Sequence, residues 1–275
     1  MKKKLTSLAS SLLFAAIACA SASHATVMED AAKPLTAPIQ AASSANAPGK
    51  TVFDASHSEI FSPVKEGPLN YTGFYKAIKK SGEEVSLNEG QINTDALARA
   101  TTYVIAGPAQ PIAMGEIAAL TDFVNNGGNL LVLLHISGPV APLTEEFGII
   151  VSNFVISEKT GNIKKQSQDF YVSAIAPHPV TAGVKRLAVF GTWGLLAEGS
   201  AKVVASTSDK AWADMNRDRK PGKDEPQQSF GVVAVSEYGK GKVVVVADDA
   251  PFANKFIGEA DNRKLADNII RWFRE

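Results

Sequence analysis

Several apolar segments of this chain are followed closely by residues whose side chains can act as acids, bases or ligands. The set comprises Asp54, Ser56, His57, His135, Ser137, Asp248 and Asp249. Carboxylates, imidazoles and hydroxyls together provide hydrogen-bond donors and acceptors as well as titratable protons. If the fold brings them to one place, they form either a ligand-binding crevice or a serine-type catalytic site.

The catalytic hypothesis assigns each group a role. Ser137 would be the nucleophile, His57 or His135 the base, and Asp54 or Asp248 the group that orients the imidazole. A hydrolase nucleophile elbow needs small residues on both sides of the serine, but Ile136 directly precedes Ser137 and no glycine stands two residues before it. Asp and Ser at strand ends also serve as ordinary caps of the following helices. Ligand recognition without catalysis is therefore the preferred interpretation.

A second set of oxygen-bearing residues has the spacing of a calcium loop. Asp214, Asn216, Asp218 and Glu225 occupy positions 1, 3, 5 and 12 of such a loop. Position 6, where calcium loops carry glycine, is Arg219. The sequence thus predicts either a calcium site or a polar loop between two strands.

Strand-like and helix-like segments alternate through the first half of the chain. Strands are expected at 51–55, 84–87, 103–106 and 129–134, and helices at 71–80, 95–99 and 114–126. Between 148 and 199 the pattern is irregular, with candidate strands at 150–155 and 187–190. Beyond it the clearest strands are 203–206, 231–236 and 242–247, before a closing helix at 261–273. This alternation predicts an α/β fold with a parallel sheet, whose ligands bind beyond the carboxyl ends of the strands.

Short motifs spread over most of residues 51–274 resemble one superfamily. They are VFDASHSEIFSP (52–63), VIAGP (104–108), NNGGNLLVLL (125–134), FGIIVSN (147–153), the HPVT.GV pattern (178–184) and VVVVADDAPFAN (243–254). The chain resembles the class I glutamine amidotransferase-like domains. Within them it is most similar to the domain of intraflagellar transport proteins and to bacterial relatives associated with gliding-motility transporters. The resemblance implies a flavodoxin-like three-layer sandwich with a mostly parallel central sheet.

The resemblance also bears on activity. Active members of the superfamily carry a cysteine nucleophile on the turn where this chain has His135, Ile136 and Ser137. The only cysteine of the chain is Cys19. The intraflagellar relatives likewise lack the nucleophile and are regarded as non-catalytic binding or scaffold modules. The resemblance therefore implies a non-catalytic role.

The first residues have the layout of a secretion signal. Three lysines are followed by an apolar run at 12–18 and by a small-x-small cleavage site at 23–25. We expect residues 1–25 to be the signal, 26–49 a flexible linker and 50–275 the folded domain. An alternative uses Cys19 as the lipid-bearing residue of a lipoprotein. Either way the protein is expected to be exported, to the periplasm or the outside.

Charge restricts the possible partners. The whole chain has 28 basic and 28 acidic residues, and removal of the three signal lysines leaves a net charge of −3. Such a surface does not favour nucleic acid, whose binding depends on basic patches. The expected partner is a protein, peptide or glycan of the cell envelope.

Overall fold

The computed structural model describes residues 49–275, all of which lie in one compact unit. The expected signal, its alternative lipid site and nearly all of the expected linker lie outside these residues. No helix among residues 49–275 is long and apolar enough to cross a membrane.

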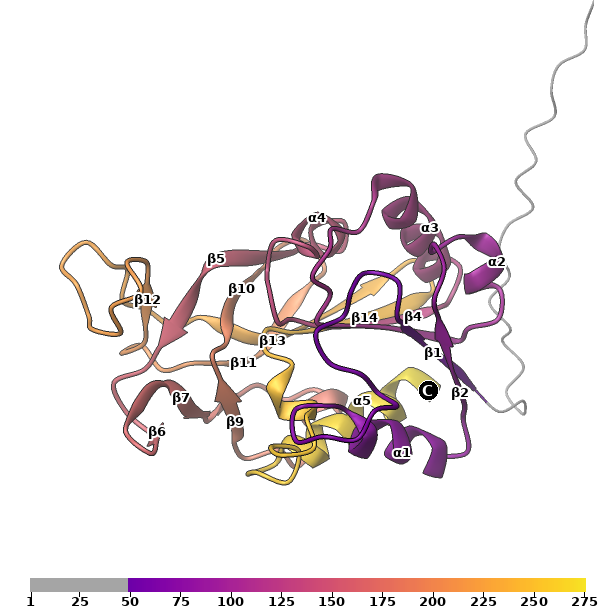
Figure 1. The fold of residues 1–275 in the computed structure, drawn as a ribbon. Helices are drawn as coiled ribbons and strands as arrows, with labels where there is room; N and C mark the ends of the chain where they lie inside the picture. The colour runs from indigo at the N-terminus through magenta and orange to yellow at the C-terminus, as the bar shows by residue number, and fades with distance from the viewer. Residues whose placement is uncertain (1–48) are drawn as a thin grey trace, which may run out of the picture. The chain divides into compact units, whose positions relative to one another are not determined.

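Strands dominate the structure (Figure 1). The helices are α1 (Thr72–Lys80), α2 (Thr94–Leu97), α3 (Met114–Asn125), α4 (Ala141–Glu145) and α5 (Asn262–Arg274). The strands are β1 (Lys50–Asp54), β2 (Glu84–Asn88), β3 (Thr102–Ala106), β4 (Asn129–Leu133), β5 (Ile149–Ser157), β6 (Asn162–Ile163), β7 (Gln166–Val172), β8 (Ala174–Ile175), β9 (Leu187–Phe190), β10 (Trp193–Ala197), β11 (Lys202–Ser206), β12 (Trp212–Asp214), β13 (Gly231–Tyr238) and β14 (Gly241–Val246). Two short 3₁₀ turns cover Pro179–Thr181 and Ala250–Phe252.

The main sheet is mixed. Its strand order is β12-β5-β10-β13-β14-β4-β3-β1-β2; off this path, β11 pairs with β13, and β8 pairs with β11. The run from β14 to β2 is parallel, whereas β5, β10, β11, β12 and β13 pair antiparallel. The expectation of a mostly parallel sheet is therefore correct for only one half of the main sheet, the strands from β14 to β2. The segment 148–199, whose sequence pattern is irregular, supplies β5, β8 and β10 of the antiparallel half and a separate sheet, β6-β7-β9.

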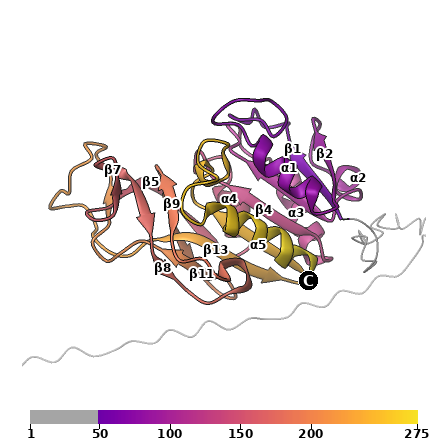
Figure 2. The same cartoon turned by 90° about the horizontal axis from the view of Figure 1, so that it is seen from below.

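Two apolar clusters lie on opposite faces of the parallel strands. Side chains alternate between the faces along each strand, so Leu131 and Leu133 of β4 join one cluster and Leu130 and Val132 the other. Helices α1 and α5 cover the first face, where Figure 2 shows them side by side, and α2, α3 and α4 cover the second (Figure 1). This packing fixes the strands whose carboxyl ends carry the candidate site residues.

Candidate functional site

The parallel half of the sheet brings most of the candidate residues to one edge. Asp54 is the last residue of β1, His135 follows β4 by two residues, and Asp248 follows β14 by two. These strands are parallel neighbours or separated only by β3, so their carboxyl ends meet. The side chains nevertheless form two separate hydrogen-bonded groups at this edge.

The first group centres on the buried side chain of His57. Its Nδ1 lies 2.6 Å from Asp54 Oδ2, and its Nε2 lies 3.0 Å from Glu116 Oε2. Glu116, on the first turn of α3, also accepts hydrogen bonds from the backbone amides of Ala113 and Ile92. His57 therefore ties the end of β1 to the start of α3, and neither ring nitrogen is left for substrate chemistry.

The two carboxylates keep His57 charged. The hydrogen bond to Asp54 raises the pKa of His57 to about 9, against the opposing effect of burial, and Glu116 acts in the same direction as Asp54. Burial alone would raise the pKa of Asp54, but hydrogen bonds to His57 and Glu59 leave it below its usual value. Likewise the pKa of Glu116 is lowered, because backbone amides and His57 outweigh burial. The group is a buried imidazolium between two carboxylates.

Glu59 adds a third carboxylate to this group. Burial, together with neighbouring Asp54, raises the pKa of Glu59 to about 7. Potential ligand atoms of Asp54, His57 and Glu59 lie within 4.8 Å of one another, which is compatible with a metal ion. However, Asp54 already accepts hydrogen bonds from Ser56, His57 and Tyr103.

Sequence reasoning identified Asp54, Ser56 and His57 but missed Glu59 and Glu116. A Glu in the first turn of the expected helix 114–126 was the available signal for Glu116.

The second group centres on Asp249. Tyr71 donates a hydrogen bond to Asp249 Oδ2 at 2.6 Å, and His135 Nδ1 lies 3.2 Å from Asp249 Oδ1. This hydrogen bond raises the pKa of His135, whose side chain is 38% exposed. Tyr71, which sequence reasoning did not select, is completely buried. The Asp249 side chain is thus contacted by one buried tyrosine hydroxyl and by one imidazole that faces solvent.

The neighbouring Asp248 is buried without a cationic partner. The backbone amides of Phe190 and Ala250 donate to its two oxygens, at 2.5 and 2.9 Å. Burial, reinforced by the charge of Asp249, raises the pKa of Asp248 to about 8. At neutral pH the carboxyl is therefore mostly protonated.

Ser137 is buried on the turn after β4, and its carbonyl oxygen accepts from the amides of Val140 and Ala141. Among residues 49–275, no hydrogen bond links the Ser137 hydroxyl to a histidine. Asp54 does orient His57, as the catalytic hypothesis expected, but the serine beside that pair is Ser56, whose hydroxyl donates to Asp54 Oδ1 at 2.8 Å and lies 3.1 Å from His57 Nδ1, and not Ser137. The geometry gives the serine hydrolase no support.

One cavity opens beside the second group, and we name it the carboxyl-edge pocket. It measures about 210 Å³ and is lined by Phe61, Leu69, Leu134, His135, Phe190, Gly191, Asp248, Asp249, Ala250, Ala253 and Phe256. His135, Asp248 and Asp249 from the predicted set contribute to it. Asp54, Ser56, His57 and Ser137 do not.

The loop with calcium-type spacing follows β12. Asp214 is buried and accepts from Gln168 Nε2 and the Arg219 amide. Asn216 accepts from the Asp218 amide, and Asp218 from the Lys220 amide. Glu225 accepts from the amides of Met215 and Gly222. All four predicted ligands thus act as acceptors, three of them only for amides within the loop.

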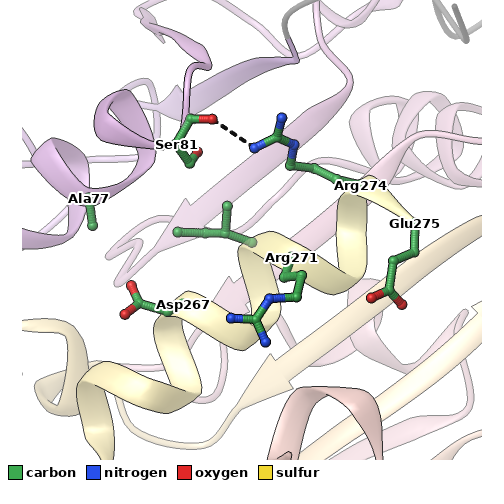
Figure 3. A pocket seen from close by; sticks show the side chains of 7 residues that line it. Ala77, Ser81, Asp267, Arg271, Arg274 and Glu275 are labelled. Atoms are coloured by element: carbon green, nitrogen blue, oxygen red, sulfur yellow. Dashed lines mark hydrogen bonds between the residues drawn. The ribbon is translucent and has the colours of Figure 1, made fainter. Parts of the chain in front are cut away.

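A larger hollow of about 440 Å³ lies between α1 and α5 (Figure 3). It is lined by Ala77, Ser81, Asp267, Ile270, Arg271, Arg274 and Glu275. Arg274 donates to the Ser81 carbonyl at 2.7 Å, and Arg271 to Asn268 Oδ1 at 3.2 Å. Asn129, at the start of β4, donates to the carbonyl of Phe273 near the end of α5. This hollow therefore lies at the amino ends of the strands, away from the predicted residues.

Solved structures share this fold at low sequence identity. The mmIFT52 N-terminal domain has a TM-score of 0.66 at 19% identity, covering 82% of this chain and 97% of its own. A ThuA-like protein from Bacteroides uniformis has a TM-score of 0.53 at 16% identity, with 84% and 94% covered. The cytoplasmic protein STM1381 from Salmonella typhimurium LT2 reaches 0.54 at 13% identity, with 82% and 100% covered. These likenesses establish the fold alone and fit the expected amidotransferase-like class.

The sequence itself also matches a family. Residues 65–270 match the family described as "Domain of unknown function (DUF4350)". No curated protein matches the chain in sequence. The match includes every residue of the carboxyl-edge pocket except Phe61.

Proposed function

The chain belongs to the DUF4350 family, and we propose that it is an exported, non-catalytic module that binds a protein, peptide or glycan of the envelope. The carboxyl-edge pocket is the observation that carries this proposal. It combines aromatic and aliphatic walls with a histidine and two carboxylates, the mixture typical of a recognition site. It also lies where open α/β sheets bind their ligands.

Two features favour binding over catalysis. His57 has both ring nitrogens occupied by carboxylates, and the Ser137 hydroxyl has no histidine partner among the described residues. A general base needs a free nitrogen within hydrogen-bond reach of the group it deprotonates.

The proposal also covers the fold and the relatives of this protein. We propose that the parallel half has a flavodoxin-like three-layer arrangement and that the chain is related to the gliding-motility-associated proteins. The proposal further includes export through residues 1–25, with Cys19 as an alternative lipid anchor.

Substitutions at the pocket rim should abolish partner capture. Immobilised full-length protein would be incubated with envelope extract of the source cells, and retained material identified by mass spectrometry. We expect His135→Ala and Leu69→Ala to lose a component that the unaltered protein retains, because both side chains line the pocket and face solvent.

Leu196→Ala provides the matched control. Leu196 on β10 is 58% exposed but does not line the pocket, so its loss should leave capture unchanged. Equal capture by the two rim variants and the unaltered protein would place the binding surface elsewhere.

We also propose, from ligand spacing, that the loop Asp214–Glu225 binds calcium. Adding calcium should raise the melting temperature of the purified protein, and a chelator should reverse the rise, because binding to the folded state stabilises it. The Asp218→Ala variant should lose the response while remaining folded, since Asp218 is exposed and contacts only its own loop. Identical melting curves with calcium and with chelator would contradict this proposal.

A further inference from the structure

The floor of the carboxyl-edge pocket carries two adjacent carboxyl groups and little positive charge. Asp249 is held by Tyr71 and His135, whereas Asp248 contacts only backbone amides. Within residues 49–275, no lysine or arginine forms a salt bridge with either aspartate. Amide dipoles only partly replace the hydration that a carboxylate loses on burial. A cationic group entering the pocket would therefore meet two carboxyl groups that, among the described residues, share one cationic contact, His135, and it would favour the ionised form of Asp248.

The walls are also suited to a cation. Phe61, Phe190 and Phe256 line the cavity, and the rings of Phe190 and Phe256 stack at 3.8 Å. Aromatic faces attract ammonium groups through the ring quadrupole. The chain already illustrates this beside the pocket, where Lys255 Nζ lies 4.8 Å from the centroid of the Phe256 ring.

The size of the cavity limits its occupant. At about 210 Å³ it is smaller than the roughly 300–1,000 Å³ typical of sites for whole drug-sized ligands. A single linear group fits this space better than a sugar ring with its several hydroxyls. Among the side chains that line the pocket, only His135 and the protonated carboxyl of Asp248 can donate a hydrogen bond, so the several hydroxyls of a sugar would find few donors.

From this geometry we propose that the carboxyl-edge pocket binds an aliphatic primary ammonium group, such as the end of a lysine side chain. Asp248 and Asp249 provide the counter-charge, and the phenylalanine rings enclose the methylene stem. This inference rests on the proposed binding function and names the chemical group that the pocket recognises.

Binding should release protons. Asp248 has a pKa of about 8, and an ammonium group nearby lowers it. The titratable and charged groups around Asp248 are Asp249, His135 and Tyr71, with Lys255 near the pocket wall. Raising the pH from 6 to 8 increases the ionised fraction of Asp248, and this change favours a cation. Affinity is thus expected to increase with pH over this range.

Titration calorimetry of the full chain at pH 7 tests the inference with n-butylammonium and its neutral counterpart, n-butanol. We expect n-butylammonium to bind with a dissociation constant on the order of millimolar, as suits so small a ligand, and n-butanol and glucose not to bind. The enthalpy should differ between phosphate and Tris buffers because a proton is released. A short acetylated peptide with one lysine should also bind, and the same peptide with acetyllysine should not.

Variants test the site itself. Asp248→Asn should weaken n-butylammonium binding at least about tenfold and abolish the buffer dependence. Asp267→Asn, at an exposed aspartate on α5, should change neither. Because Asp248 is buried, a second pair tests the rim: Leu69→Lys, which brings a competing ammonium to the pocket, should weaken binding, whereas Leu69→Gln should not.

Two results would overturn the ammonium assignment. One is binding of n-butanol or glucose as tight as that of n-butylammonium. The other is no n-butylammonium binding at concentrations up to about 50 mM, far above the expected millimolar constant. If envelope capture still depended on His135 in either case, the proposed function would stand and only the recognised group would change.

Discussion

Replacing His57 with alanine is expected to lower the free energy of unfolding by about 3–5 kcal/mol, because removing one member of a buried ion pair leaves its partner charged and unpaired. Both Asp54 and Glu116 would lose the imidazolium that lies 2.6 and 3.0 Å from them. The two carboxylates come from different elements, β1 and α3, so the loss also disconnects the start of α3 from the sheet.

The contacts of His57 with Asp54 and Glu116 also make the free energy of unfolding depend on pH. The pKa of His57 is raised in the folded state from 6.5 to about 9, so its contribution is fully present below pH 6.5 and is lost as the pH rises through 9. Glu59 and Asp248, whose pKa values are raised to about 7 and 8, also make stability fall with increasing pH. These two carboxyl groups remain when His57 is replaced. The difference in stability between the two proteins therefore reports His57 together with Asp54 and Glu116, whose pKa values it lowers.

Urea unfolding followed by tryptophan fluorescence at pH 6, 7.5 and 9 measures both effects. The stability gap between the unaltered protein and His57→Ala should be largest at pH 6 and should narrow by pH 9. His135→Ala is the matched control, since His135 also contacts a carboxylate but is 38% exposed, and it should cost no more than about 1 kcal/mol. A gap that stays constant with pH would refute a charged His57.

Adding one methyl group at Gly241 should destabilise the protein by about 3 kcal/mol, the upper end of the usual cost of overpacking. Gly241 begins β14, directly after the turn that joins it to β13. A Cβ placed there would overlap the carbonyl oxygens of Gly128 and Val124. Both oxygens belong to the backbone after or within α3, so no side-chain rotation relieves the overlap, and the turn must move.

Gly138→Ala is the matched control for Gly241→Ala. A Cβ at Gly138 has no heavy atom within 4 Å, and its backbone is not in the left-handed region. Its stability should change by no more than about 0.5 kcal/mol, as is usual for surface positions. Urea midpoints of the two variants and the unaltered protein give the comparison. Equal midpoints for both variants would show that the turn adapts without cost.

Local sequence patterns identified the parallel strands correctly. The segment 130–134 is apolar at successive positions, and in the structure every residue of β4 is buried between two neighbouring strands. The turn 238–241 joins β13 and β14 as expected. In these segments the apolar run and the adjacent glycines are local signals, and burial on both faces requires exactly such runs.

The pairing of the antiparallel half could not be predicted in this way, although the strands at 150–155, 203–206 and 231–236 were expected and are present as β5, β11 and β13. The strand β5 is nine residues long, but most of its residues are only partly buried, so it lacks a continuous apolar run. It pairs with β10 and β12, which lie far along the chain. Pairing between distant segments depends on the whole packed structure rather than on local spacing. For this reason the expected mostly parallel sheet proved to be mixed.

For the site, the sequence by itself determined which reactive side chains follow the parallel strands, because that depends on strand ends that local patterns reveal. It thereby selected His135, Asp248 and Asp249, three residues of the pocket. Only the tertiary structure decided which side chains meet. Tyr71 and Glu116 reach Asp249 and His57 from 178 and 59 residues away, and no spacing in the chain encodes such contacts. Side-chain contact is a property of packing in three dimensions. At this edge of the sheet, the residues expected in one crevice lie in two places, the buried ion cluster around His57 and the carboxyl-edge pocket beside Asp249.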